Sequence, residues 1–259
     1  MDAFLIGLQF LTRIHVERQT VWTEENFGRS VKFFPLIGAI VGIITSALTG
    51  IFFLVTGGKL PVLTGAVAFV LPILLTGGIH CDGFMDSVDG LFSGREREKI
   101  LEIMKDSRVG AFGAVSLVLL AALEISALVE LVRLSINFCL AGIFCAPMIS
   151  RLMMVVTIGI FPYARREGMG KAFAKFTTRR TIFFALATTL IILLPIICVD
   201  VKIFLTALFS VAVAFGFTLY FGNFAQKKIG GVTGDIYGAV STLVELIVLI
   251  IFCCVGAMI

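Results

Sequence analysis

Charged side chains are scarce in this chain of 259 residues, and so are histidines. Asp, Glu, Lys and Arg make up 15% of the residues, whereas hydrophobic residues make up 59%. About a quarter of an ordinary soluble domain is charged, so this composition excludes a soluble globular enzyme and also a disordered chain. The two His and six Cys lack the spacing of a zinc site. Most of the Cys lie inside apolar runs, which excludes a secreted disulfide scaffold.

What the chain has in abundance is apolar runs of roughly the 20 residues that a helix needs to cross a bilayer. We count seven, at about residues 34–56, 60–79, 109–132, 136–161, 181–199, 203–222 and 236–259. No internal repeat and no Gly/Ser-rich linker separates them. We therefore predict an all-α, polytopic integral membrane protein with about seven transmembrane helices in a single domain, residues 1–259.

The basic residues predict which side of the membrane each loop faces. With the N-terminus in the cytoplasm, 17 of the 21 Lys and Arg fall in inner segments, as the positive-inside rule requires. The candidate catalytic loops, at about residues 80–108, 162–180 and 223–235, then face the cytoplasm from the cell (inner) membrane. Basic side chains and helix N-termini there favour anionic substrates. The expected macromolecular environment is the lipid bilayer, and no nucleic acid is expected.

Three aspartates follow the second apolar run at helical spacing. Asp82, Asp86 and Asp89 stand at i, i+4 and i+7, which places them on one face if the segment is helical. Carboxylates crowded in this way favour a shared cation, and hard oxygen ligands select Mg²⁺ or Mn²⁺. The alternative is a solvated acidic turn. His80 would point away from Asp82 on such a helix, so we expect it to face substrate or to be structural.

Other polar residues gather in the same inner loops. Asp106 is either an N-cap for the third run or a functional carboxylate, and Lys105 and Arg108 flank it. The loop at 163–170 is rich in Arg and Gly, and a guanidinium fits phosphate oxygens well. Asp235 precedes the last run and has the same two interpretations as Asp106.

Two charged residues lie deep within apolar runs. Arg151 and Glu245 stand ten and nine residues from the inner ends of their runs, at depths of roughly 15 and 14 Å for a rise of 1.5 Å per residue. Charges at one depth in a bilayer usually pair or line a cavity. We predict that these two form an ion pair or the floor of a cavity open to the cytoplasm.

Several segments together resemble the cobalamin synthase family, the adenosylcobinamide-GDP ribazoletransferases. The matching segments are FLTRIHV at 10–16, FFPLIGAIVG at 33–42, HCDGFMDSVDG at 80–90, LEIMKDSRVGAFG at 101–113, SR at 150–151, YARREGMG at 163–170 and KKIGGVTGDIYGA at 227–239, with Glu245 beyond. The resemblance runs nearly end to end. It implies a transferase that joins adenosylcobinamide-GDP to α-ribazole, or to its 5′-phosphate, and releases GMP with Mg²⁺ as cofactor.

The resemblance also implies roles for individual residues. Metal at Asp82, Asp86 and Asp89 would neutralise charge on the diphosphate while the ribose 3′-hydroxyl attacks the cobinamide-linked phosphorus. Asp106, Asp235 or His80 would orient or deprotonate that hydroxyl, and the sequence does not choose among them. The residues expected to bind substrate or phosphate are Arg13, Arg95, Lys105, Arg108, Arg151, Tyr163, Arg165, Glu167, Thr233 and Glu245. Self-association, or association with other enzymes of the corrinoid pathway, is left open.

Two rival functions share some of these features. A CDP-alcohol phosphotransferase also uses aspartates at helical spacing beside a membrane, but its Asp-Gly-x-x-Ala-Arg signature is absent here, since Asp86-Ser87 occupies the Ala-Arg position. A transporter would use Arg151 and Glu245 along a path through the bilayer. The three aspartates in a predicted cytoplasmic segment favour the transferase over both.

Overall fold

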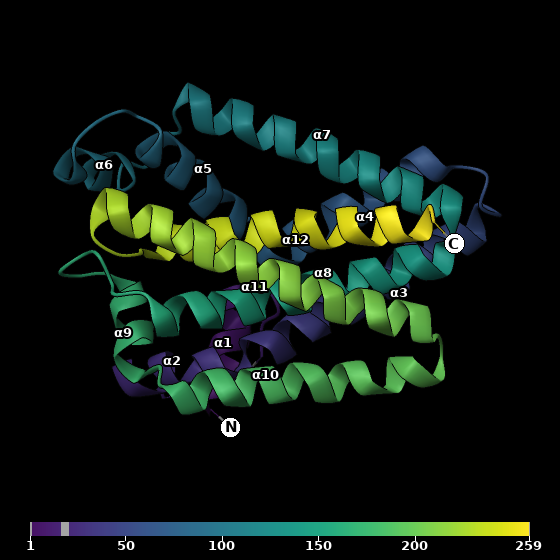
Figure 1. Cartoon of the computed structure of the whole chain (residues 1–259), viewed down its shortest axis with the longest axis horizontal. Coiled ribbons are helices and arrows are strands. Elements are labelled where there is room, and N and C mark those ends of the chain that lie inside the picture. The colour runs from purple at the N-terminus through teal and green to yellow at the C-terminus, as the bar shows by residue number, and fades with distance from the viewer. Residues whose placement is uncertain (1, 17–20, 259) are drawn as a thin grey trace.

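The computed structural model describes residues 2–16 and 21–258, and helices account for the regular structure of this part of the chain (Figure 1). The helices are α1 (Asp2–Leu11), α2 (Glu24–Arg29), α3 (Phe34–Val55), α4 (Pro61–Thr76), α5 (Ile79–Leu91), α6 (Arg97–Ile103), α7 (Ala111–Leu134), α8 (Ile136–Ile160), α9 (Met169–Phe176), α10 (Arg179–Leu193), α11 (Val201–Ile229) and α12 (Gly234–Gly256), with 3-10 segments η1 (Ser30–Phe33) and η2 (Leu194–Cys198). The one β contact among the described residues is an isolated parallel bridge between Tyr163 and Val232. The predicted all-α class is confirmed.

Among the described residues, six helical segments are long and apolar enough to cross a membrane. They contain α3, α7, α8, α10, α11 and α12. Helices α4 and α5 pass the same test only together, and they are bent by 92° relative to each other, so seven crossings result if this broken pair counts as one. The number of transmembrane helices therefore agrees with the prediction from the apolar runs.

The break between α4 and α5 lies at two consecutive glycines. Gly77 and Gly78 have φ angles of +68° and +74°, a left-handed conformation that side chains with a Cβ disfavour. Gly77 ends α4, and a new helix starts at Ile79 in a different direction. The chain thus turns sharply at the point where the predicted apolar run 60–79 ends, and the aspartates that follow are carried on a helix.

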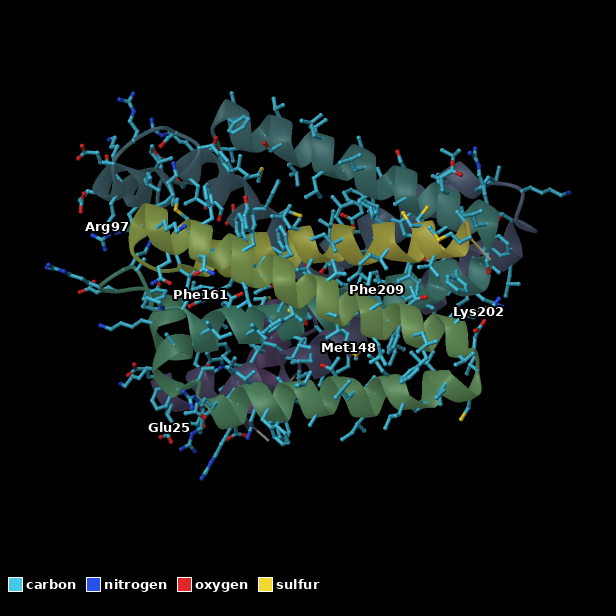
Figure 2. All side chains as sticks on the ribbon, in the orientation of Figure 1. Glu25, Arg97, Met148, Phe161, Lys202 and Phe209 are labelled. Carbon is cyan, nitrogen blue, oxygen red and sulfur yellow. The ribbon has the colours of Figure 1, made fainter. Side chains whose placement is uncertain are left out.

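Helix α8 is the centre of the bundle. It packs against α3 on one side and α12 on another, and its buried residues include Met148, Arg151 and Val155. A helix that is apolar on all sides belongs in an interior, because each of its faces must be covered by another helix. Figure 2 places Met148 near the middle of the molecule, between the two ends of the bundle.

The two ends of the bundle differ in their polar content. The short helices α2, α6 and α9 gather at one end (Figure 1), and Glu25 and Arg97 lie there in Figure 2, whereas Lys202 lies at the other. We call the first the polar end, made of residues 22–30, 92–110, 161–179 and 227–235. Which end faces the cytoplasm stays a prediction from the distribution of basic residues.

Candidate active site

Helix α5 presents the aspartates that the sequence singled out. It is continuous from Ile79 to Leu91, so Asp82, Asp86 and Asp89 lie on successive turns, as the i, i+4, i+7 spacing predicted. The Asp82 side chain is exposed, and Asp86 and Asp89 are half-buried. The helix on which the predicted cluster depends is therefore present.

A fourth carboxylate reaches the cluster from the opposite end of the sequence. Helices α5 and α12 cross at Gly83 and Gly238, where a Cβ added to Gly83 would lie 3.2 Å from the Cα atom of Gly238. Glycines at such a crossing let two backbones approach closely. Asp235, in the first turn of α12, is thereby brought to α5, and its charge acts on Asp86 together with those of Asp82 and Asp89.

Asp235 is oriented by two neighbouring side chains. Its Oδ2 atom accepts hydrogen bonds from Nη2 of Arg165 at 2.7 Å and from Oγ1 of Thr233 at 3.2 Å. Thr233 also caps α12, since its Oγ1 accepts from the backbone N–H of Ile236. Three sequence candidates thus meet at one point, and Arg165 brings a positive charge next to the aspartates.

The Asp89 side chain has hydrogen-bond partners that the sequence did not reveal. Its two carboxylate oxygens each accept a hydrogen bond, at 2.8 Å, from the backbone N–H groups of Gly110 and Gly113 at the start of α7. A carboxylate at a helix N-terminus satisfies free N–H groups and complements the helix dipole. Asp89 therefore joins α5 to α7.

The side chains of the described residues do not by themselves form a complete set of metal ligands. Within residues 2–16 and 21–258, no three His, Cys, Asp or Glu side chains are gathered in a position to hold one ion. Mg²⁺ keeps several of its waters and is often bound through only one or two carboxylates together with substrate phosphates. Asp82 and Asp86, with Asp235 beside them, suit that mode of binding.

Two adjoining cavities open beside the aspartates. The first, which we call the α5–α12 cavity, has a volume of about 160 Å³ and is lined by His80, Asp82, Asp235 and Tyr237, among others. The second, the α1–α5 hollow, measures about 540 Å³ and is lined by residues that include Arg13 and Met85. Both are lined by Asp82, so this carboxylate stands where the two spaces meet.

Arg13 lies over the break that creates this geometry. Its backbone N–H donates to the carbonyl of Leu75 at 2.6 Å, and its guanidinium lies where a side chain on Gly77 would have to go. A cation thus lines the α1–α5 hollow, which Asp82 also lines. This position is compatible with the phosphate-binding role that the sequence predicted for it.

His80 and Tyr237 both line the α5–α12 cavity and are buried, with exposed fractions of 7% and 2%. Among the described residues, His80 Nε2 and Tyr237 Oη have no hydrogen-bond partner, although buried polar atoms are nearly always paired. Sequence reasoning did not select Tyr237, because a lone tyrosine near the start of an apolar run gives no signal of function.

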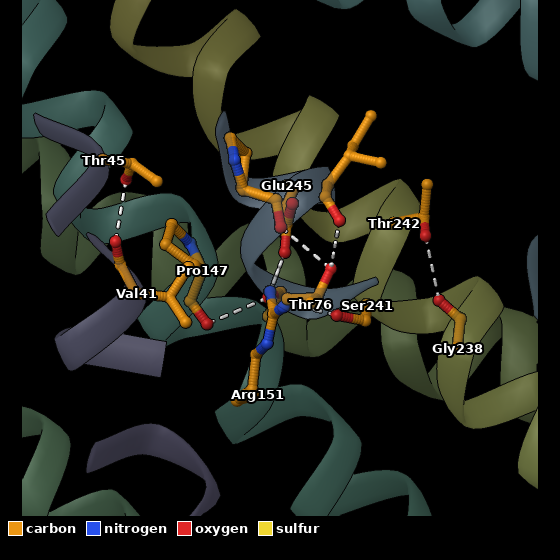
Figure 3. A network of polar contacts seen from close by, with 12 residues as sticks. Val41, Thr45, Thr76, Pro147, Arg151, Gly238, Ser241, Thr242 and Glu245 are labelled. Atoms are coloured by element: carbon orange, nitrogen blue, oxygen red, sulfur yellow. Dashed lines mark hydrogen bonds and ion pairs between the residues drawn. The ribbon is translucent and has the colours of Figure 1, made fainter. Parts of the chain in front are cut away.

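Arg151 and Glu245 form an ion pair within the bundle, as predicted (Figure 3). Ser150 Oγ donates to Glu245 Oε1 at 3.1 Å and accepts from Arg151 Nη1 at 2.9 Å, and Ser241 Oγ donates to Ser150 Oγ at 3.3 Å. Arg151 is 2% exposed. The pair lines a small inner cavity of about 30 Å³ that His80 also lines, so His80 stands between the two cavities.

The remaining candidates lie at the polar end but outside these cavities. Arg108 and Asp106 bind each other through Arg108 Nη2 and Asp106 Oδ2 at 2.7 Å, and this bond holds the pKa of the Asp106 carboxyl at about 2. Arg95, Lys105 and Glu167 are exposed. Tyr163 packs against Gly168 and Gly170. The structure does not bring Asp106 to the α5–α12 cavity.

Arg97 connects the loops of the polar end and was not selected from the sequence. Its Nε donates to the carbonyl of Ile229 at 2.8 Å and its Nη2 to the carbonyl of Ala164 at 3.1 Å. The loop with Arg165 and the loop with Thr233 are also joined by the bridge between Tyr163 and Val232. Only the folded chain reveals this role, because the partners lie 67 and 132 residues away.

Comparison with known proteins identifies the family. The family described as cobalamin-5-phosphate synthase matches residues 3–253. Proteins named adenosylcobinamide-GDP ribazoletransferase are similar along nearly their whole length: one from Desulfitobacterium hafniense (strain Y51) is 38% identical over 96% of both chains, and one from Fusobacterium nucleatum is 33% identical over 97% of both. A third, from Clostridioides difficile (strain 630), is 35% identical over 96% of both. No solved structure gives a significant match. The chain belongs to the cobalamin-5-phosphate synthase family.

Proposed function

We propose that this protein joins adenosylcobinamide-GDP to α-ribazole, or to α-ribazole 5′-phosphate, with release of GMP. The names of its relatives support this reaction, which is a transferase step of cobalamin synthesis. The observation that carries the proposal for the site is the convergence of Asp82 and Asp86 of α5 with Asp235 of α12 beside a cavity. A diphosphate substrate needs its charge balanced where a phosphorus is attacked.

In this reaction the 3′-hydroxyl oxygen of α-ribazole bonds to the cobinamide-linked phosphorus, and the bond from that phosphorus to the GMP oxygen breaks. The hydroxyl proton must pass to an acceptor close to the reacting oxygen. Of the three candidates from the sequence, His80 and Asp235 line the α5–α12 cavity and Asp106 does not. We therefore assign proton transfer to His80 or Asp235.

The acidic cluster fits a bound Mg²⁺. Asp82, Asp86 and Asp235 bring three carboxylates together with one guanidinium, that of Arg165, so the cluster has excess negative charge that a dication would offset. Asp82 and Asp86 would hold the ion, with Asp89 fixing the helix that carries them. When bound, Mg²⁺ would supply charge neutralisation for the diphosphate and the departing GMP.

The basic residues of this chain have a separate role in binding phosphate. Arg165 holds Asp235 while keeping a guanidinium beside the cavity, and Arg13 lies at the neighbouring hollow. A guanidinium offers several donors in a rigid fork, which orients a phosphate as well as attracting it. We assign the substrate diphosphate to the space between these two arginines.

The polar end is proposed to face the cytoplasm, with the N-terminus on the same side. The support is the excess of Lys and Arg in the predicted inner segments, as the positive-inside rule requires. A cysteine introduced at exposed Ser107 in a Cys198→Ser background should react with a membrane-impermeant maleimide in inverted vesicles only. In the unmodified chain, native Cys198, exposed on η2 after α10, should react in right-side-out vesicles. Reaction of the cysteine at position 107 in right-side-out vesicles would show that the polar end faces away from the cytoplasm.

The reaction is tested with purified protein, adenosylcobinamide-GDP and α-ribazole. We expect one GMP released per corrinoid product formed, with turnover abolished by EDTA and restored by added Mg²⁺. CDP-diacylglycerol with serine or glycerol phosphate serves as the control substrate set and should give no CMP. Failure to release GMP under saturating substrate and Mg²⁺ would reject the proposed reaction. Turnover unaffected by EDTA would reject only the requirement for Mg²⁺ and would leave the proposed reaction standing.

A further inference from the structure

A third space at the polar end is unexplained by the groups assigned so far. It has a volume of about 390 Å³ and lies between α2, with the residues just before it, and α9. Trp22, Glu24 and Phe27 line one side, and Met169 and Lys171 line the other. We call it the α2–α9 hollow. Met169 also lines the α5–α12 cavity, so the hollow and the candidate active site share this residue.

Aromatic rings form a stepped stack beside this hollow. Phe27 stacks on Phe173 with ring centres 4.4 Å apart and planes 28° apart, and Trp22 lies 6.0 Å from Phe27 at 29°. Trp22 is 53% exposed although it is a large apolar ring, and it is the only tryptophan in the chain. Exposed aromatic rings with free faces are the groups on which nucleobases stack.

The charged side chains of the hollow complement the edge of guanine. Glu24 offers carboxylate oxygens, and guanine presents N–H donors at N1 and N2. Lys171 offers an ammonium group, which suits the acceptors O6 and N7 of the same base. Glu24 also contacts Lys175 at 3.1 Å, but both side chains are more than half exposed, and such pairs contribute little. Glu24 is thus available to a ligand.

We propose that the α2–α9 hollow binds the guanine base of the nucleotide substrate, with the base stacked on Trp22 and read by Glu24. The inference rests on the proposed function, because it assumes a guanosine diphosphate substrate. With the base in the hollow, the attached ribose and diphosphate extend past Met169 toward Asp82 and Asp235. The benzimidazole of α-ribazole lacks N–H donors that would pair with a carboxylate, so it is the weaker occupant.

The single tryptophan provides a direct binding assay on the full-length protein in detergent. Titration with GMP should quench Trp22 fluorescence to saturation, and AMP should bind roughly tenfold more weakly, since a bidentate base contact discriminates by about that factor or more. Glu24→Gln should weaken GMP binding roughly tenfold and leave AMP binding unchanged. Glu25→Gln is the matched control, because Glu25 does not line the hollow and pairs with Arg29 instead.

Turnover gives an independent readout. Trp22→Ala should raise KM for adenosylcobinamide-GDP roughly tenfold with little change in kcat, since stacking contributes to binding only, and Trp22→Phe should retain most of the affinity. Unsaturable quenching, equal quenching by AMP or α-ribazole, or equal effects of Glu24→Gln and Glu25→Gln would overturn the guanine site. Specific GMP binding in a protein that releases no GMP from the substrate would instead retain this site and reject the proposed reaction.

Discussion

Two groups of charged side chains in this protein differ in how their charges are balanced. Inside the bundle, Arg151 and Glu245 neutralise each other, and Ser150 hydrogen-bonds to both. Beside the α5–α12 cavity, Asp82 and Asp86 stand close to an Asp235 that already holds Arg165. We call Arg151 and Glu245 the closed group, because each charge has an internal partner. We call Asp82, Asp86 and Asp235 the open group, because they have surplus negative charge beside a cavity, which is the condition for binding a cation and a ligand.

The largest effect should follow from neutralising the open group. Asp82→Asn removes a charge that lines the cavity, and Asp86→Asn removes the charge next to it in the cluster, each without removing volume. We therefore expect GMP release to fall roughly 10²–10³-fold or more, with thermal stability retained. Steady-state assays over a range of Mg²⁺ concentrations measure both the rate and the apparent metal affinity. Glu102→Gln is the control, since Glu102 is an exposed carboxylate at the polar end that contacts Lys99.

Full activity of either aspartate variant at saturating Mg²⁺ would show that this cluster does not hold the metal. An unchanged rate accompanied by a large loss of stability would show instead that the open group, like the closed one, is structural. Either result would break the distinction between the two groups.

Breaking the closed group should mainly reduce stability. Arg151→Met leaves a carboxylate without its partner, and uncompensated buried charges cost about 3–5 kcal/mol. The double variant Arg151→Met with Glu245→Met should recover part of this loss, since no lone charge remains. Unfolding in detergent measures the effect, and Arg133→Met, which breaks an exposed pair with Glu130, should cost less than about 1 kcal/mol.

A double variant as unstable as the sum of the two single variants would mean that Arg151 and Glu245 act independently. The charge-swapped pair, Arg151→Glu with Glu245→Arg, tests the same point. Restoration of stability by the swap supports pairing, and failure of the swap together with additive single effects contradicts it.

Asp89 shares features with both groups. It lies on the acidic face of α5, like Asp82 and Asp86, but its carboxylate is already paired with backbone N–H groups. Asp89→Asn should cost about 1–2 kcal/mol of stability through the start of α7, with a smaller loss of activity than Asp82→Asn. Asp200→Asn is matched to it, since Asp200 caps α11 by accepting from Lys202 N–H. If Asp89→Asn abolishes turnover and lowers Mg²⁺ affinity while the protein stays stable, Asp89 is a metal ligand as the spacing predicted.

The smallest effect should be seen at Asp106. Its bond to Arg108 lowers the pKa of the Asp106 carboxyl to about 2, so the group is charged at neutral pH, and any stabilisation from it is lost only as the pH falls toward that value. Asp106→Asn should therefore leave the pH profile of kcat unchanged between about pH 5 and 9. A shifted pH profile would indicate that Asp106 takes part in proton transfer.

The apolar runs and the helical spacing of Asp82, Asp86 and Asp89 were readable from the sequence because both depend on local periodicity. The depth argument for Arg151 and Glu245 also succeeded, since rise per residue along a helix is nearly constant. The sharp turn at Gly77 and Gly78 was not predicted. Two glycines permit a left-handed conformation, but the 92° bend also depends on packing partners that lie far along the chain, since α4 contacts α7 and α3 whereas α5 contacts α12 and α7.

Local chemistry in the chain thus determined that this protein is a helical membrane protein with an acidic face, basic loops and a buried ion pair. Tertiary packing decided which of these groups meet: Asp235 joins Asp86 because α5 and α12 cross at Gly83 and Gly238, and Asp89 is drawn to the start of α7. It also placed Trp22 beside α9. Such contacts join residues many positions apart, and they depend on how closely two helix backbones can approach, which no local pattern encodes.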